Sequence, residues 1–270
     1  MRALAAWIVG GPVQAVTMIV GCTGLSFLAP PLTSILGYIG AAGLAVYTLQ
    51  QGGRSGVIVM LAAVTTVALL TALLLQQGGL AVVATSAMLW LPLWLAAVVL
   101  KETLSLAMAI LVLSGLAMLG VSLVYLFYGD PTGWWQQFLT DWVGNLATRA
   151  GMTPEDTQPL VDFVGLAAPI MTGALAAGLS FAAMACLVLG RWWQSLLVKP
   201  GALKQEFMAL RLNRPLSLAG IAILVLAELN LGIVSDFLLQ WALIVMVPFL
   251  FVGLAVVHAT VANLNAGRGW

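Results

Sequence analysis

The sequence predicts an all-α protein, a polytopic bundle of about eight transmembrane helices. The first observation is composition: the 270-residue chain is 62% hydrophobic and only 7% charged, with a mean hydropathy of +1.09. Soluble domains carry about 25% charged residues. The second observation is that charges and Gly/Pro clusters separate apolar runs of roughly the 20 residues that cross about 30 Å of hydrocarbon. Lipid is therefore the predicted solvent.

Eight apolar runs are the candidate spans. The first is longer than the apolar core of a signal peptide, which is about 7–15 residues, so we predict a retained helix. Gly10-Gly11-Pro12 lies inside this run, and Pro12 breaks or kinks a helix because it removes one backbone hydrogen bond. Ala29-Pro30-Pro31 separates the first two runs. The predicted spans are 3–29, 32–50, 56–76, 80–100, 104–128, 163–190, 216–234 and 238–262.

The Lys and Arg residues predict the orientation, because cytoplasmic loops of membrane proteins are enriched in them. A cytoplasmic N-terminus puts nine of the ten basic residues on the cytoplasmic side, with Arg149 as the exception. The segment 129–162, which holds five Asp and Glu residues, then lies outside. The segment 191–214, with five Lys and Arg residues, is cytoplasmic. No linker divides the chain, so we predict one N-in/C-in membrane domain over 1–270.

Two short helices are expected on the membrane surfaces. Near 133–150, five apolar side chains stand at helical spacing, and tryptophan favours the headgroup region. This helix is either an anchor or a lid over an outward-facing cavity. Thr153 is expected to cap the next helix, with Pro154 at its first position. The five side chains are Trp134, Trp135, Phe138, Leu139 and Trp142.

The helix expected near 202–212 is amphipathic and belongs to the cytoplasmic basic segment. Anionic lipid attracts such a helix, and docking of a cytoplasmic partner is the alternative. The expected lipid or partner surface is formed by Arg191, Trp192, Trp193, Lys204, Arg211 and Arg214.

A ligand site is predicted around Glu228, the one carboxylate deep in an apolar run. An ionised side chain at mid-bilayer costs at least about 2.5–3.5 kcal/mol, so such groups usually face a cavity or a partner. Asn230 follows it, and Gln14 and Thr17 are expected to complete a polar seam from the first helix. The alternative is a hydrogen-bonded or protonated Glu228 that fastens two helices, or one close enough to the interface to stay hydrated.

Catalysis, metal binding and cofactor binding are not expected. His258 is the only histidine, and the two cysteines, Cys22 and Cys186, lie in separate apolar runs, so no metal spacing arises. His258 is expected to hydrogen-bond a neighbouring helix or to relay protons. Phosphate-binding loops and protease motifs are absent from the sequence. The net charge of +1 argues against a nucleic-acid partner.

The stretches RWWQSLL, KPG and QEFMALRL, with the later AVVHA, resemble the YybS-like family of bacterial integral membrane proteins. The resemblance implies a multi-pass protein of the bacterial inner membrane. That family is functionally uncharacterised and loosely grouped with the S components of energy-coupling-factor transporters. This implies capture of a small solute, together with a coupling subunit that would meet small residues of the first helices. Members usually carry one further apolar helix, so this chain is expected to be truncated or a short member.

The sequence thus predicts a non-enzymatic membrane protein that binds or transports an unknown small solute, as a subunit of a larger complex. The alternative is a structural or assembly subunit that holds partner membrane proteins. The lipid bilayer is the expected partner in either case.

Overall fold

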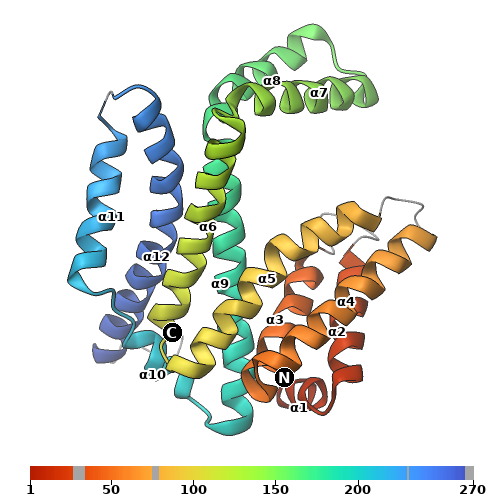
Figure 1. Ribbon diagram of the computed structural model, residues 1–270, viewed down its shortest axis with the longest axis vertical. Coiled ribbons are helices and arrows are strands. Elements are labelled where there is room, and N and C mark those ends of the chain that lie inside the picture. The colour runs from red at the N-terminus through yellow and green to blue at the C-terminus, as the bar shows by residue number, and fades with distance from the viewer. Residues whose placement is uncertain (27–33, 75–78, 230, 265–270) are drawn as a thin grey trace. The chain divides into compact units, whose positions relative to one another are not determined.

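The computed structural model describes residues 1–26, 34–74, 79–229 and 231–264, and over these residues every regular element is a helix (Figure 1). The predicted all-α class is confirmed. The elements are α1 (Arg2–Val9), α2 (Pro12–Ser26), α3 (Ser34–Gln51), α4 (Gly53–Leu74), α5 (Gly79–Thr103), α6 (Leu106–Tyr128), α7 (Thr132–Ala150), α8 (Pro154–Ala167), the 3-10 helix η1 (Ala168–Ile170), α9 (Met171–Val198), α10 (Ala202–Met208), α11 (Arg214–Ala227) and α12 (Ile233–Asn263).

Within the described residues, five helical segments are long and apolar enough to cross a membrane, or six if the bent pair α1 and α2 is one span. At most 39% of the most apolar part of each segment is buried inside the protein. The remaining apolar surface fits a lipid environment, as expected of a multi-pass membrane protein. The count of about eight spans and the N-in/C-in orientation stay predictions. The five segments are Gly53–Leu73, Val83–Thr103, Leu106–Tyr128, Pro154–Val198 and Ile233–Asn263.

The first predicted span is not one continuous helix. α1 and α2 meet at a bend of 119°, at the Gly10-Gly11-Pro12 sequence. α1 ends with a hydrogen bond from the Gly10 N–H to the carbonyl oxygen of Trp7, three residues earlier, at 3.1 Å. α2 then begins at Pro12, a position that tolerates proline because the first N–H groups of a helix have no partner in it.

The seventh predicted span is shorter than expected. α11 ends at Ala227 rather than at 234, and Glu228 is its C-cap. Its 14 residues rise about 21 Å at 1.5 Å per residue, less than the roughly 30 Å hydrocarbon thickness. The chain reverses before α12 through Gly232, whose φ of 63° favours glycine. Asn213 starts α11 by accepting a hydrogen bond from the Leu216 N–H at 3.1 Å.

The chain forms two compact units. Unit 1 comprises 1–113, 179–212 and 248–270, and unit 2 comprises 114–178 and 213–247. Three of the four boundaries fall within α6, α9 and α12, and the fourth lies between α10 and α11. The single transmembrane domain predicted over 1–270 stays a prediction.

Helix α3 is the centre of unit 1. It packs against α1, α2, α4 and α5, and its residues 41–49 are buried around the whole helix, as a core helix requires. Small residues allow this packing. A Cβ on Gly190 of α9 would lie 2.7 Å from the Ala45 Cβ and 3.0 Å from the Ala42 carbonyl oxygen, so α9 touches the backbone of α3.

Unit 2 contains a helix where the tryptophan spacing predicted one, and its place at the membrane surface stays a prediction. α7 covers the predicted range and packs against α8 and η1. The predicted cap of α8 is confirmed: Thr153 and Asp156 form a capping box, and Pro154 occupies the first turn. The predicted helix near 202–212 is shorter, because α10 ends at Met208.

Candidate functional site

A fully buried glutamine, Gln240 of α12, braces the break between α8 and α9 in unit 2. Its side-chain amide donates to the Pro169 carbonyl at 2.7 Å and to the Asp236 carbonyl at 3.2 Å. Its side-chain oxygen accepts from the Gly173 N–H at 2.7 Å. Backbone groups freed at a helix break must find partners when water is excluded, and Gln240 serves one on each side of this break.

The local sequence explains both the break and its closeness to α12. Pro169 has no N–H and its ring disfavours a continuous α-helix, so the chain takes the 3-10 turn of η1. Gly173 follows, and a Cβ there would lie 2.6 Å from the Gln240 Cα. Glycine is therefore required for the two backbones to approach closely enough for the hydrogen bonds of Gln240.

Aromatic rings lie near this brace, and Asp236 stands one helical turn before Gln240 on α12. Tyr125 of α6 makes an edge-to-face contact with Phe237, with ring centroids 5.1 Å apart. The ring centroids of Phe237 and Trp241 lie 5.2 Å apart. The Asp130 and Asp236 carboxylates and the Gln240 side chain act electrostatically on the Tyr125 hydroxyl, and the Asp236 side chain is exposed. We call Tyr125, Asp236, Phe237, Gln240 and Trp241 the Tyr125 cluster. The indole N–H of Trp241 is buried without a hydrogen-bond partner among the described residues.

The charge of unit 2 favours a cation at this cluster. The unit has seven Asp and Glu residues but only two arginines, Arg149 and Arg214. The only ion pair among the described residues belongs to unit 1. Carboxylates and the faces of aromatic rings both attract cations, so the acidic residues of unit 2 and the rings of the Tyr125 cluster both favour a positively charged ligand.

The predicted ligand residues are not all found in one unit. Glu228 has an exposed side chain in the turn after α11 of unit 2, whereas Gln14 and Thr17 lie on α2 of unit 1. Asn230 lies outside the described residues. The Tyr125 cluster was not predicted. Its available signals were a glutamine inside the apolar run 238–262 and a proline inside 163–190.

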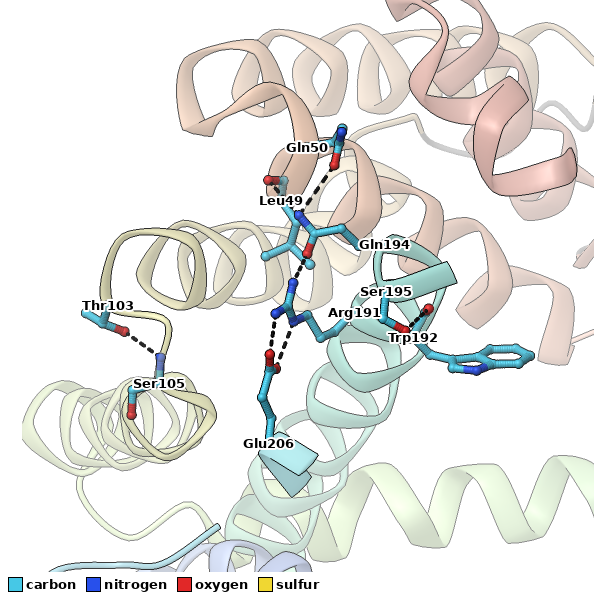
Figure 2. A network of polar contacts seen from close by, with 9 residues as sticks. All are labelled: Leu49, Gln50, Thr103, Ser105, Arg191, Trp192, Gln194, Ser195 and Glu206. Atoms are coloured by element: carbon cyan, nitrogen blue, oxygen red, sulfur yellow. Dashed lines mark hydrogen bonds and ion pairs between the residues drawn. The ribbon is translucent and has the colours of Figure 1, made fainter. Parts of the chain in front are cut away.

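A second polar network lies in unit 1, at the predicted cytoplasmic basic segment (Figure 2). The Arg191 guanidinium pairs with both carboxylate oxygens of Glu206 on α10 and also donates to the Gln194 side chain. Gln194 in turn donates to the Leu49 carbonyl at the end of α3, at 3.1 Å. The network fixes α10 to α9, and α9 to α3.

Two donors on α5 bond carbonyls at the end of α3 and at the start of α4. The last carbonyls of a helix have no partner within the helix. The Lys101 ammonium donates to the Gln50 carbonyl at 3.2 Å, and the Trp94 indole donates to the Gly53 carbonyl at 2.9 Å. Gln51 donates to the Val9 carbonyl of α1 at 2.9 Å. Side chains of several helices thus hold the α3–α4 turn in place.

The predicted lipid or partner surface divides into an inner and an outer group. Arg191 is 17% exposed because it binds Glu206, and Trp193 is 2% exposed, in the core of unit 1. These two residues are therefore not free surface residues as expected. Trp192 is partly exposed, and Lys204, Arg211 and Arg214 are exposed. Adjacent tryptophans suit an interface and a core equally, so the sequence did not distinguish them.

Within the part of the chain that the structure describes, His258 bonds its own helix and not a neighbouring one as expected. Its Nδ1 lies 2.7 Å from the Leu254 carbonyl of its own helix. Its contact with α10 is an edge-to-face ring contact with Phe207, with centroids 5.7 Å apart. Over the described part of the chain, no group of three or more His, Cys, Asp or Glu side chains has a metal-binding arrangement.

Comparisons with known proteins assign no family. No family model matches the chain, and no curated protein or solved structure is significantly similar to it. The resemblance to the YybS-like family stays a prediction.

Proposed function

We propose that this chain is a multi-pass protein of the bacterial inner membrane, with both ends cytoplasmic, that binds a small solute for capture or transport. The observation that carries the proposal is the buried Gln240, which braces a broken helix next to the contacting rings of Tyr125, Phe237 and Trp241. The predicted outward orientation of 129–162 puts this cluster toward the outer side of the membrane.

Broken helices support a binding role for a physical reason. Irregular backbone at membrane depth is tolerated only where protein covers it or where it lines a cavity. Transporters use such breaks to direct backbone groups and polar side chains at their substrates. The two amide hydrogens of Gln240 are used by the brace, so the Tyr125 hydroxyl and the Asp236 carboxylate are the groups that would meet a solute there.

The solute class that fits best is a small organic cation of the ammonium type. Asp236 supplies a carboxylate that forms no ion pair among the described residues. Tyr125, Phe237 and Trp241 supply ring faces, which attract ammonium groups by about 0.5–2 kcal/mol each.

A direct test uses the purified protein in lipid nanodiscs with choline and tetraethylammonium as probes. We expect either probe to raise the unfolding temperature, and Asp236→Asn to remove the shift. Glu155→Gln, an exposed carboxylate of the same unit, is the matched control and should keep the shift. Equal shifts in all three proteins, or none in any, would reject the Tyr125 cluster as the site.

Glu228 has its own test because it is the candidate that the sequence predicted. Loss of probe binding in Glu228→Gln, at normal expression, would add this carboxylate to the site. Unchanged binding would remove Glu228 and leave Asp236 as the essential carboxylate.

A scaffolding role is the second candidate, and one observation favours it. The Arg191–Glu206 pair fixes α10 to α9, while Lys204 and Arg211 remain exposed. Affinity purification from native membranes distinguishes the two functions. A stoichiometric partner that is lost on neutralising Lys204, Arg211 and Arg214 favours scaffolding. A copurifying small molecule without a partner favours solute binding. A coupling subunit, as the predicted family resemblance implies, would be compatible with both.

A further inference from the structure

Helix α7 has a broad apolar side that is only half covered by protein. One half carries Trp135, Leu139 and Val143, and faces α8 and η1. Val143 is buried, and the Trp135 indole donates to the Thr172 hydroxyl at 2.7 Å. The other half is uncovered.

The uncovered half is a continuous stripe of large apolar side chains four residues apart, which we call the α7 stripe. Each is between 39% and 60% exposed. Trp134 and Phe138 stack with ring centroids 5.5 Å apart and planes 9° from parallel. Single exposed apolar residues are ordinary, but a contiguous patch marks a surface that something covers. The α7 stripe consists of Trp134, Phe138, Trp142 and Leu146.

The chain that precedes α7 indicates what covers the stripe. α6 is an apolar helix of 23 residues, about 34 Å long at 1.5 Å per residue, which is enough to cross the hydrocarbon core. Its last residues, Phe127 and Tyr128, are largely exposed. Only 129–131 separate α6 from α7, and α7 runs across the end of α6 (Figure 1). A helix that crosses the end of a membrane span lies at the membrane surface, where tryptophan is favoured.

We infer that the α7 stripe inserts into the outer headgroup layer of the protein's own bilayer and binds zwitterionic phospholipid in preference to anionic phospholipid. The lipid preference follows from charge: segment 129–162 has five carboxylates and a single basic residue, Arg149. Anionic headgroups are repelled by such a surface, whereas the ammonium of a zwitterionic headgroup is attracted by carboxylates and indole rings. This inference rests on the membrane placement in the proposed function, not on solute binding.

The test measures depth on two sides of α7 in proteoliposomes. A single cysteine replaces either Trp142, in the stripe, or Thr140, which is exposed on the polar side, in a Cys22→Ala, Cys186→Ala background. Each is labelled with an environment-sensitive fluorophore. In phosphatidylcholine vesicles, we expect several-fold stronger quenching at Trp142→Cys by nitroxide-labelled lipid than by iodide. The reverse is expected at Thr140→Cys.

Two outcomes would overturn the inference. Iodide quenching as strong at Trp142→Cys as at Thr140→Cys would show that the stripe faces water. Protection of Trp142→Cys from both quenchers would show that protein covers it. Phosphatidylglycerol in the vesicles should reduce lipid quenching at Trp142→Cys, and an increase would reject the lipid preference.

A second measurement keeps the test valid if the cysteine-free background does not fold. Cys186 is buried and Cys22 is half-buried, so both single-cysteine changes can be made in the native background and probed with a water-soluble maleimide. We expect rapid reaction at Thr140→Cys and several-fold slower reaction at Trp142→Cys, and equal rates would contradict the inference. Failure of the choline probe would leave these depth results unchanged, so the two proposals fail separately.

Discussion

Units 1 and 2 differ in charge and in the way they are held together. Unit 1 has eight Lys and Arg residues against two acidic ones, whereas unit 2 has two against seven. In unit 1, side chains of α5 and α9 cap the end of α3, and glycines bring backbones into contact. In unit 2, a buried glutamine and a set of aromatic rings make the main connections.

The glycines show the difference most directly. In unit 1, an added Cβ would clash at Gly53, Gly56 and Gly190. In unit 2, only Gly173 is so confined, and a Cβ on Gly120 or Gly165 would meet nothing within 4 Å. We therefore expect unit 1 to tolerate little change of volume, and unit 2 to depend on the surroundings of Gln240.

The largest effect is expected from Gln240→Leu. The Pro169 carbonyl and the Gly173 N–H lose their side-chain partner, and each buried unpaired group costs about 1–3 kcal/mol. Unfolding in detergent should occur at lower temperature, with faster hydrogen exchange around the break. Gln137→Leu, an exposed glutamine of α7, is the control. Equal stability of both variants would mean that Gln240 does not brace the break.

Gly190→Ala tests whether the helices are packed more closely inside unit 1 than inside unit 2. The added methyl meets the Ala45 Cβ and α3 backbone atoms, and overpacking of this kind costs about 1–3 kcal/mol. The same substitution at Gly120 in unit 2 should be neutral or slightly stabilising, because alanine is the better helix former. Thermal unfolding of the two variants is the measurement. Similar shifts of the unfolding temperature in both variants would show that the two units are packed equally closely at these positions.

Glu206→Ala should have a smaller effect, about 1–2 kcal/mol, because the ion pair with Arg191 is partly hydrated. Hydrogen exchange should rise in α10 before any global loss of stability. Glu206→Gln should be intermediate, since the amide oxygen still accepts a hydrogen bond. Lys204→Ala on the same helix is the control. Unchanged exchange in Glu206→Ala would show that the pair does not fix α10.

Thr153→Ala is the smallest of the four changes. Loss of the α8 cap should cost about 1 kcal/mol, and Thr153→Ser should preserve most of it because the hydroxyl can still accept from the Asp156 N–H. The melting temperatures of the two variants and of the unchanged protein give the comparison. Equal loss in both variants would argue that methyl packing, not the cap, is responsible.

Local features of the fold followed from the sequence alone. The apolar composition required lipid, Gly10-Gly11-Pro12 marked a break, and Thr153-Pro154 marked the start of α8. Composition is a sum over the whole chain, and the helix break and the helix start depend on residues within a few positions of one another, so neither needed knowledge of tertiary contacts. The end of α11 was placed too late because Glu228 stops the helix without any proline or glycine directly after it.

The candidate sites depend on contacts between distant segments. Gln240 hydrogen-bonds a helix break some 70 residues earlier in the chain. Arg191 pairs with Glu206 instead of facing solvent. In a soluble helix the apolar side identifies the buried face. In a membrane, lipid-facing and protein-facing side chains are both apolar, so the pattern along a helix does not show its rotation. Packing of the helices therefore placed Trp193 in the core, Lys204 on the surface and Tyr125 against Phe237.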